Sequence, residues 1–564
     1  MKNLLIFLLG FVKICFGQAA QTTPSGTLIA NQNPAVAMPS SSLFEVRSNT
    51  KGMLPPRMTT NRINAIVSPT IGLMAYDIDV KCLKIYNGSE WECSNANVVA
   101  STPVSSSFAF QSITDNVVNP ESITADNSGN TITVGYFNSA ITFGNANNVM
   151  TLTSLGNADG YISKHDQNGN LIWATQIGGS ANNQDIRDVE IDNLGNIVVV
   201  GYLIGGTTFF STNGSTAVYN APVTSAKAFV AYYNSSGILQ WYKLVDSSGD
   251  SDCLGVTFDS LGNILFTGYF TGTASFDNIS KVSVGSSNDI FVAKLNTTGT
   301  YQWVKTAGGT DNGEYGVKLT CDNSNNVYVY GSYTGTASFG ENSSIINLTS
   351  RGSSDSFISK FDANGNIQWV KTLGSTFEEG LGDIVYSSAT NNIFLSGSYK
   401  GTLTFGTGLG TNSLLPIGNY INYFDGFLAK YDLNGNVLWA VRNGCVNDFH
   451  NYTNGVSVDS NGNPYITGTI QRDTYFYSTN SNSPYLIQGV HEGEPFIAKY
   501  NSTGNLLWTI LATDGYYDSC VSIAVKNNTA NVVGKFSQTI NFGFQQLRVV
   551  VENQYHMFTW RYAE

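Results

Sequence analysis

Residues 355–374 read DSFISKFDANGNIQWVKTLG, and this stretch decides the fold. Hydrophobic and polar residues alternate on both sides of residues 362–366 (DANGN), which is the pattern of two strands joined by a tight turn. An Asp side chain hydrogen bonds to the backbone of such a turn, and Gly takes the positive φ that closes it. The segment therefore predicts a β-hairpin whose second strand carries Trp369.

The same hairpin recurs along the chain, and a second hairpin accompanies each copy. The second type has strands such as residues 255–258 (GVTF) and 264–270 (ILFTGYF), joined by DSLGN. Tandem units of four strands are typical of β-propellers. A tryptophan stands at the same place in the last strand of six units, so we interpret these residues as blade packing rather than as a ladder for sugar stacking. They are Trp173, Trp241, Trp303, Trp369, Trp439 and Trp508, spaced 62 to 70 residues apart.

The two ends of the repeat region are incomplete in complementary ways. The first strand of the unit recurs seven times, at residues 122–126, 188–192, 255–259, 317–322, 383–388, 455–459 and 522–526. The region opens at residues 108–111 (FAFQ) with a fourth-type strand, and it stops at residues 557–562 (MFTWRY) with a third-type strand. We therefore predict an all-β, seven-bladed propeller over residues 108–564. Its N-terminal strand completes the seventh blade, which leaves no unpaired sheet edge in the ring.

The units resemble the SBBP-type β-propeller repeat of secreted bacterial proteins. That repeat has the signatures G-N-x-Y-V-T-G and F-V-A-K-Y-D-x-x-G-N-x-x-W, which residues 462–468 (GNPYITG) and 427–439 (FLAKYDLNGNVLW) follow closely. The resemblance covers about residues 108–564. It implies the propeller fold and an exported bacterial protein, and it implies little about a ligand.

The first hundred residues differ in character from the repeats. Lys2 and the apolar residues 4–12 are typical of a secretory signal peptide, assigned to residues 1–18, so we expect a secreted or cell-surface protein. Residues 24–96 contain LFEV (43–46), KGMLPPRMT (51–59), GLMAYD (72–77) and YNGSEW (86–91). This string resembles a short module of bacterial surface and tail-fibre-like proteins. Residues 97–107 are predicted to be a linker.

Seven cysteines are present, and six remain after removal of the signal peptide. Cys82 and Cys93 flank a predicted hairpin, and an oxidising compartment allows a disulfide bridge between them. The pairing of Cys253, Cys321, Cys445 and Cys520 stays open.

Composition excludes several classes of function. The 564 residues are 42% hydrophobic and only 12% charged, with a net charge of −12. A chain this apolar is not disordered. It has no basic patch for nucleic acid, and its charge disfavours polyanionic partners. No stretch after the signal peptide approaches the ~18 apolar residues of a transmembrane helix.

Recognition is expected on the propeller face with variable loops, such as residues 204–227, 400–424 and 471–495. Carboxylates gather in the connections on that face, and the ligand-binding candidates are Asp185, Asp252, Asp518, Glu378 and Glu379. Asp246, Asp250 and Asp252 crowd one connection and could bind calcium through their oxygens. The simpler interpretation is solvated surface acids, since no Asp-x-Asp-x-Asp-Gly loop occurs. We expect no other cofactor.

Catalytic motifs are absent from the sequence. It has no Gly-x-Ser-x-Gly elbow, no His-Glu-x-x-His and no phosphate loop. We therefore expect a non-catalytic binding or adhesion protein whose loop face meets a glycan or a protein. One alternative is an extracellular polysaccharide lyase or hydrolase, which predicts carboxylates with His, Tyr or Arg converging on one concave pocket. Another alternative is a structural spacer with no ligand.

Overall fold

A computed structural model of the chain divides it into two units, residues 1–98 and 99–564. It describes residues 19–23, 26–30, 44–47, 56–67, 69, 73–79, 82–86, 91–93, 108–111 and 113–114. It also describes residues 117–563 except 146–147, 181–182, 221–224, 286, 312, 342–343, 407–411, 419–420, 448, 490–491, 514–517, 543–544 and 549–554. The predicted signal peptide and linker lie outside the described residues. In the part that is described, no helix is long and apolar enough to cross a membrane.

The N-terminal unit contains two small sheets. Strands β1 (Ala19–Thr23), β2 (Gly26–Ala30) and β3 (Phe44–Arg47) form the first, and β4 (Arg57–Met58), β5 (Met74–Asp77), β6 (Cys82–Tyr86) and β7 (Trp91–Cys93) form the second. A single-turn helix, α2 (Thr60–Asn64), follows β4. Buried Asp77 accepts a hydrogen bond from the Thr60 hydroxyl at 2.7 Å and pairs with Lys84 at 3.1 Å. The side chains of Cys82 and Cys93 lie outside the described ones, so their predicted bridge stays a prediction.

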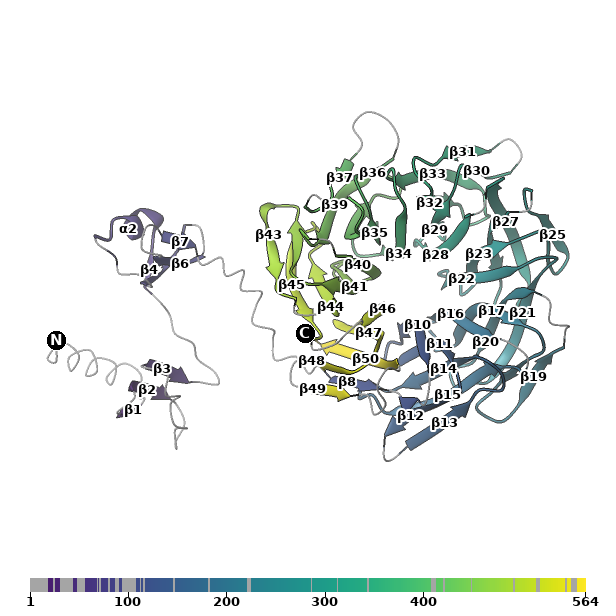
Figure 1. Ribbon diagram of the computed structural model, residues 1–564, viewed down its shortest axis with the longest axis horizontal. Helices are drawn as coiled ribbons and strands as arrows, with labels where there is room; N and C mark the ends of the chain where they lie inside the picture. Colours follow the sequence, from purple (N-terminus) through teal and green to yellow (C-terminus); the bar gives the residue numbers. More distant parts are fainter. Residues whose placement is uncertain are drawn as a thin grey trace. The chain divides into compact units, whose positions relative to one another are not determined.

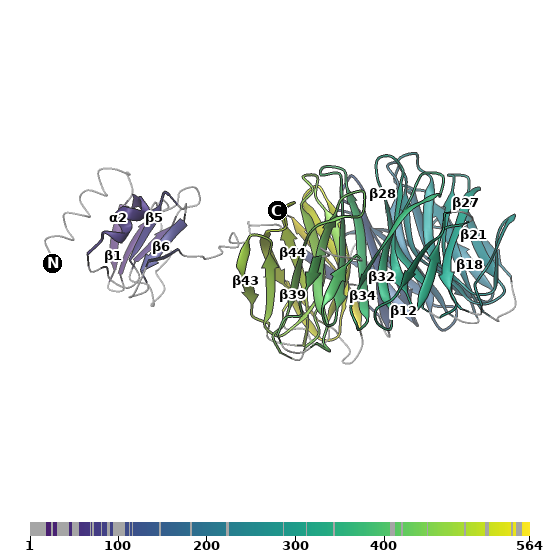
Figure 2. The same ribbon diagram turned by 90° about the horizontal axis from the view of Figure 1, so that it is seen from above.

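The second unit is a ring of seven blades, which confirms the predicted fold (Figure 1). Each blade has four antiparallel strands, which are given below in order from the channel outward. In chain order the blades are β10 (Val118–Ala125), β11 (Thr131–Phe137), β14 (Asp159–His165) and β15 (Leu171–Gly178); β16 (Gln184–Ile191), β17 (Ile197–Ile204), β20 (Ala226–Tyr233) and β21 (Leu239–Ser247); β22 (Ser251–Phe258), β23 (Ile264–Phe270), β26 (Asp289–Leu295) and β27 (Tyr301–Gly309); β28 (Tyr315–Cys321), β29 (Val327–Tyr333), β32 (Asp355–Phe361) and β33 (Ile367–Gly374); β34 (Glu379–Ser387), β35 (Asn392–Tyr399), β38 (Asp425–Tyr431) and β39 (Val437–Gly444); β40 (Tyr452–Val458), β41 (Pro464–Gln471), β44 (Glu492–Tyr500) and β45 (Leu506–Leu511); and β46 (Ser519–Lys526), β47 (Thr529–Phe536), β50 (His556–Ala563) and β8 (Phe108–Gln111). Figure 2 shows the ring edge-on, with the strands running across its thickness.

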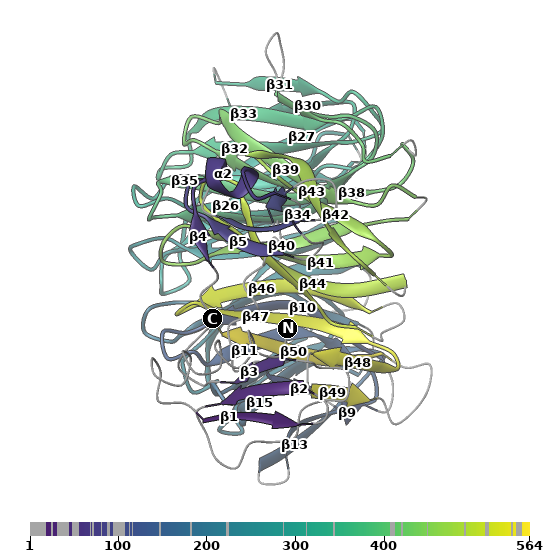
Figure 3. The same cartoon turned by 90° about the vertical axis from the view of Figure 1, so that its left-hand side faces the viewer.

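The ring closes as the sequence predicts. Strand β8, from the start of the repeat region, pairs antiparallel with β50, from the end of the chain, in register Phe558↔Gln111 to Arg561↔Phe108. Gln545 accepts a hydrogen bond from the Ala109 backbone N–H at 2.7 Å. The last blade then lies beside β10 of the first blade (Figure 3).

The Asp-x-x-Gly-Asn turns form as predicted. Asp259 is typical: its Oδ1 accepts hydrogen bonds from the backbone N–H groups of Leu261 and Asn263, both at 2.9 Å. Its Oδ2 accepts from the Asn263 amide and pairs with Lys294 of β26, again both at 2.9 Å. Gly262 has φ +79°, which favours glycine at that place. The turn residues are therefore explained by structure alone.

The repeated tryptophans join neighbouring blades. The indole N–H of Trp303 donates to the Ala363 carbonyl at 3.1 Å, in the outer turn of the next blade. Gly365 of that turn lies against the Trp303 ring, because a Cβ there would stand 2.8 Å from its Cδ2. Trp173, Trp241, Trp369 and Trp439 make the equivalent hydrogen bond. These contacts agree with a blade-packing role.

The long connections predicted to be recognition loops largely form hairpins. These hairpins are β12 (Ala140–Asn145) with β13 (Asn148–Thr153), β18 (Thr207–Phe210) with β19 (Thr216–Tyr219), β24 (Thr273–Phe276) with β25 (Ile279–Val282), β30 (Thr336–Phe339) with β31 (Ile346–Thr349), β36 (Leu403–Phe405) with β37 (Asn412–Leu414), β42 (Thr474–Ser478) with β43 (Ser481–Ile487), and β48 (Thr539–Phe542) with β49 (Gln545–Arg548). Five of them pair with the outer strand of the preceding blade, as β18 pairs with β15. The β12 strand instead pairs with the short β9 (Ile113–Thr114) beside β8. Much of the length variation in these connections therefore serves sheet extension.

Candidate ligand-binding site

The innermost strand of every blade contains a β-bulge. The register shifts in β10, β16, β22, β28, β34, β40 and β46, always just before the stretch that lines the channel. A bulge leaves a residue outside the ladder and re-aims its side chain. The residues skipped by the ladder are Glu121, Arg187, Leu254, Val317, Gly382 with Asp383, Asn454 and Val521. Only the first and second blades place two oppositely charged bulge residues next to each other.

Arg187 ties three blades together. Its guanidinium contacts Asp185 of the same strand at 2.8 Å, Asp252 of the third blade at 3.3 Å and Glu121 of the first blade at 3.7 Å. It also lies over the Tyr202 ring, 5.2 Å from the centroid. One cation is therefore surrounded by three carboxylates.

Glu121, Asp185 and Arg187 line a pocket of about 490 Å³ over blades 1 and 2, and Asp252 stands behind Arg187 outside the lining. That volume is within the range of small-molecule sites. Two tyrosines at equivalent places in β11 and β17, Tyr136 and Tyr202, are half-buried in its wall. The lining residues are Val117, Asn119, Glu121, Tyr136, Asn138, Ala158, Asn183, Gln184, Asp185, Arg187 and Tyr202. Aromatic rings and amide groups thus surround the charged centre.

Blade 7 contributes a second cation beside the pocket. The Lys535 ammonium donates to the Asn119 side-chain oxygen at 2.8 Å, and the Asn119 amide donates to Glu121. Burial lowers the pKa of Lys535, with Glu121 acting in the opposite direction.

Burial dominates the electrostatics of the cluster. It raises the pKa of Glu121, although Arg187 and the Asn119 hydrogen bond oppose it. It raises the pKa of Asp185 well above its ordinary value, with Glu121 and Asp252 adding to the effect. The pKa of Asp252 rises to about 6 for the same reason, opposed by Arg187. Burial therefore favours the neutral forms of these three carboxyl groups, which outnumber the cations Arg187 and Lys535 beside them.

The structure brings two of the five predicted binding residues together. Asp185 and Asp252 meet at Arg187, at equivalent places opposite Tyr202 and Tyr269. Asp518 does not join them, because Ser519 takes the equivalent place opposite Lys535. A shift of one residue turns a strand side chain to the other face. Asp518 is buried as Asp185 and Asp252 are, but its Oδ1 accepts a hydrogen bond from the Ser537 N–H instead of meeting Arg187.

Glu378 and Glu379 diverge from each other. Glu378 is 54% exposed and pairs with Lys400 at 2.6 Å. Glu379 accepts a hydrogen bond from the Ser375 N–H at 2.8 Å, and burial raises its pKa to about 8. Neither lines the pocket over blades 1 and 2.

The three carboxylates proposed for calcium are held in different directions. Asp246 is 74% exposed near Lys227, Asp250 accepts a hydrogen bond from the Ala226 N–H, and Asp252 pairs with Arg187. Within the described residues, no three His, Cys, Asp or Glu side chains are placed to hold a metal ion.

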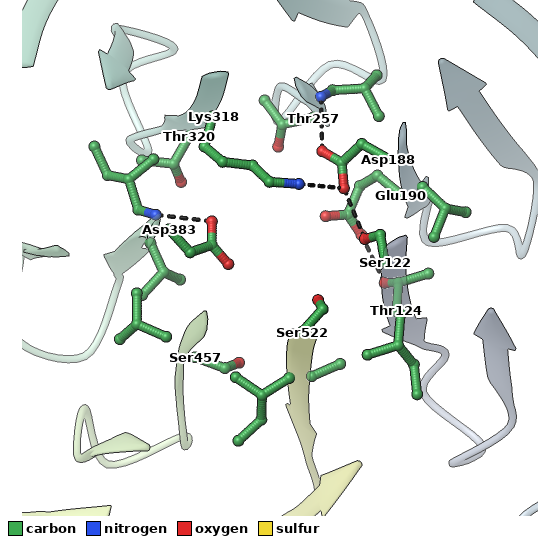
Figure 4. A pocket seen from close by; sticks show the side chains of 18 of the residues that line it. Ser122, Thr124, Asp188, Glu190, Thr257, Lys318, Thr320, Asp383, Ser457 and Ser522 are labelled. Carbon is green, nitrogen blue, oxygen red and sulfur yellow. Dashed lines mark hydrogen bonds and ion pairs between the residues drawn. The ribbon is translucent and has the colours of Figure 1, made fainter. Parts of the chain in front are cut away.

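The central channel is a separate, narrower cavity of about 240 Å³ (Figure 4). Lys318 extends across it to Asp188, with an Nζ–Oδ1 distance of 2.7 Å. Asp188 also accepts hydrogen bonds from the Ser122 hydroxyl and the Val256 N–H. On the other side stands Asp383, whose pKa burial raises to about 6 although Lys318 opposes it. These contacts cross between blades, so we assign them to holding the ring together.

Sequence reasoning missed Glu121 and Arg187, the two residues at the centre of the pocket. Both are bulge residues, and a bulge leaves no mark in the alternation of apolar and polar residues. One signal was present in the sequence. Arg187 stands two residues after Asp185, whereas the equivalent residue of the next unit, two residues after Asp252, is the apolar Leu254.

Comparisons with known proteins found one family model and one curated relative that resemble the chain. A family model described as a phage tail-like trimerisation region matches residues 29–107. The uncharacterized WD repeat-containing protein L264 of Acanthamoeba polyphaga mimivirus is 26% identical over 527 residues. This chain is a β-propeller repeat protein. The match covers 78% of the chain but only 37% of the mimivirus protein, so the chain spans little more than a third of that relative.

Solved structures with a similar arrangement include two enzymes. A streptogramin B lyase structure matches over 81% of this chain and 98% of its own, with 10% identity and a TM-score of 0.35. The phage phi92 endosialidase matches over 90% of this chain and 75% of its own, with 10% identity and a TM-score of 0.32. Similarity at this level says nothing about ligand or activity.

Proposed function

We propose that the chain is a secreted or cell-surface binding protein that holds a glycan in the pocket over blades 1 and 2. The observation that carries this proposal is the composition of the pocket wall. Half-buried Tyr136 and Tyr202 line the wall, with Arg187 over one face of Tyr202, and Glu121 and Arg187 place polar groups at the centre. Ring faces beside a few fixed polar groups suit a sugar, whose own faces are apolar and whose edge carries hydroxyls.

The N-terminal unit supports a role in display. The matching family model is described as a trimerisation region, and three propellers on one assembly would bind a repeating glycan with much higher avidity than one. The predicted signal peptide fits the same picture, since it places the protein where glycans are exposed.

The alternative of a lyase or hydrolase has one observation in its favour, because carboxylates, an arginine and tyrosines do converge on a pocket. Their exposure favours binding. The side chains of Asp185 and Asp252 are 4% and 6% exposed and are held by Arg187, whereas that of Glu121 is 20% exposed. Glycoside hydrolysis generally needs two carboxylates flanking the scissile bond. One accessible carboxylate suits recognition better.

A glycan array probed with the full chain tests the proposal. We expect binding that Tyr136→Ala and Tyr202→Ala each abolish. Tyr269→Ala is the matched control, because Tyr269 takes the equivalent place in blade 3 and packs on Tyr315 outside the pocket. Equal loss in the control, or binding that survives both pocket variants, would place the ligand elsewhere. Release of new sugar ends that Glu121→Gln abolishes would instead favour the enzyme.

A further inference from the structure

The pocket over blades 1 and 2 is built around a cluster in which acidic groups outnumber cations. Glu121, Asp185 and Asp252 surround a single guanidinium, that of Arg187. Lys535 is nearby, and the Asn119 side chain bridges it to Glu121. The side chains of Asp185 and Asp252 are more than nine-tenths buried, so water does little to screen them.

The hydrogen bonding of the carboxyl groups in the cluster is also incomplete. Arg187 contacts the Oδ2 atoms of Asp185 and Asp252. The Oδ1 atom of each is buried and accepts no hydrogen bond of standard geometry, although the backbone N–H groups of Ile186 and Cys253 act to lower the pKa of these carboxyls. A buried carboxylate oxygen without a donor is costly, and Asp185 itself lines the pocket. The site is therefore rich in acceptors, and a further cation with hydrogen-bond donors would stabilise its carboxylate forms.

From this excess of acceptors we propose that the pocket selects a sugar bearing a free primary ammonium group, as in a glycan that contains glucosamine. The proposal rests on the glycan-binding function proposed above and names its ligand class. An ammonium group brings one positive charge and three donors, which is what the three carboxylates lack. An anionic sugar would meet Glu121 and Asp185, and an N-acetylated sugar would bring one amide donor and no charge.

The pocket wall favours an amino sugar over a lysine side chain. A flexible lysine stem needs an apolar channel, whereas the lining of this pocket includes two tyrosines together with Asn138 and Asn183. The tyrosine faces suit the ring of the sugar, and the amides suit its hydroxyls. Glu121, the most exposed of the three carboxylates, is the group that would meet the ammonium first.

Paired ligands test the inference on the full chain. Calorimetric titration with a glucosamine oligomer, its fully N-acetylated form and a lysine oligomer of equal length isolates the ammonium and the sugar in turn. We expect the glucosamine oligomer to bind at least about tenfold more tightly than either of the others. Glu121→Gln removes one charge and keeps the shape, and it should weaken glucosamine binding about tenfold. Asp277→Asn, a carboxylate paired with Lys243 away from the pocket, should leave it unchanged.

The outcomes separate the two proposals. Equal binding of the acetylated oligomer, with loss in Tyr202→Ala, overturns the ammonium inference and leaves glycan binding standing. Tighter binding of the lysine oligomer overturns the choice of a sugar. Absence of binding to any glycan overturns both proposals. The comparison of oligomers uses the unaltered protein, so it remains decisive if a variant fails to fold.

Discussion

Replacing Glu314 by Gln should stabilise the propeller at pH 8 and have little effect at pH 4.5. Glu314 is fully buried just before β28. Burial raises its pKa to about 7, and Asp289 and Asp311 add to the effect. The equivalent residue of blade 2 is Gln184. Gln184 precedes Asp185, which pairs with Tyr202, and Glu314 precedes Tyr315, which pairs with Ser332. Tyr202 and Ser332 each directly follow the glycine of the second strand of their blade. Gln184 donates its amide to the Ile204 carbonyl at 3.1 Å.

The magnitude follows from the difference between folded and unfolded pKa. The shift from 4.5 to about 7 corresponds to at most about 3 kcal/mol at 1.36 kcal/mol per pKa unit, and relaxation around the charge reduces this to about 2 kcal/mol. Below pH 4.5 the Glu314 carboxyl is neutral in both the folded and the unfolded chain, so it does not lower the free energy of unfolding. Between pH 4.5 and 7 the unfolded chain ionises first, so stability falls as pH rises. Above pH 7 the loss is complete.

Thermal unfolding of wild type and Glu314→Gln at pH 8 and pH 4.5 measures the effect. The variant should melt higher at pH 8, and the two curves should converge at pH 4.5. Gln184→Glu is the matched control: it places a carboxylate near Asp159, whose pKa burial already raises to about 6, and it should lower the melting temperature at pH 8. The same shift at both pH values, or no shift at pH 8, would refute the reasoning.

Three further perturbations test the ring itself. Gly365→Ala should lower the free energy of unfolding by about 3 kcal/mol, because it combines a φ of +81° with a Cβ only 2.8 Å from the Trp303 ring. Gly214→Ala is the control: it has a φ of +83° but open space around the Cβ, and it should cost about 1 kcal/mol. Equal midpoints of urea unfolding for the two variants would contradict the packing role of the tryptophan. Asp259→Ala removes three hydrogen bonds and an ion pair from one turn and should cost about 3 kcal/mol by the same assay. A chain without residues 108–114 should aggregate, as judged by light scattering, because β50 becomes an exposed edge, and a peptide of that sequence added in excess should suppress the aggregation. Aggregation that ignores the peptide would argue against the edge as its cause.

The fold was predictable because its signals are local and repeated. The turn at Asp259 is encoded within five residues, and six tryptophans mark the same strand in successive units. Ring closure followed from two incomplete ends, and β8 pairs with β50 as expected. Each of these features depends on short-range pattern or on counting, which one sequence supplies.

The site was less accessible to sequence reasoning. Asp185 and Asp252 were identified, but what joins them is Arg187, which the bulge in β16 leaves outside the ladder. Asp518 stands one residue before the place equivalent to Asp185 and Asp252. The first strand of blade 7 ends without the usual turn, so its sequence gives no landmark that fixes the position of Asp518. Side-chain direction in a strand changes with every residue, so a single shift moves a candidate from the pocket to the blade interior.

The outer hairpins have a consequence for how such a ring can change over time. Five of the hairpins belong to one repeat along the chain but complete the sheet of the repeat before it, as β18 and β19 complete the sheet that begins with β10. The sequence repeat that a duplication copies is therefore offset along the chain from the sheet that forms one structural unit. A duplicated or deleted repeat includes its share of the contacts to the blade before it and to the blade after it. The interface between the blades that then become neighbours is therefore of a kind that the protein already makes. Ring size can then vary by whole repeats without the invention of a new interface.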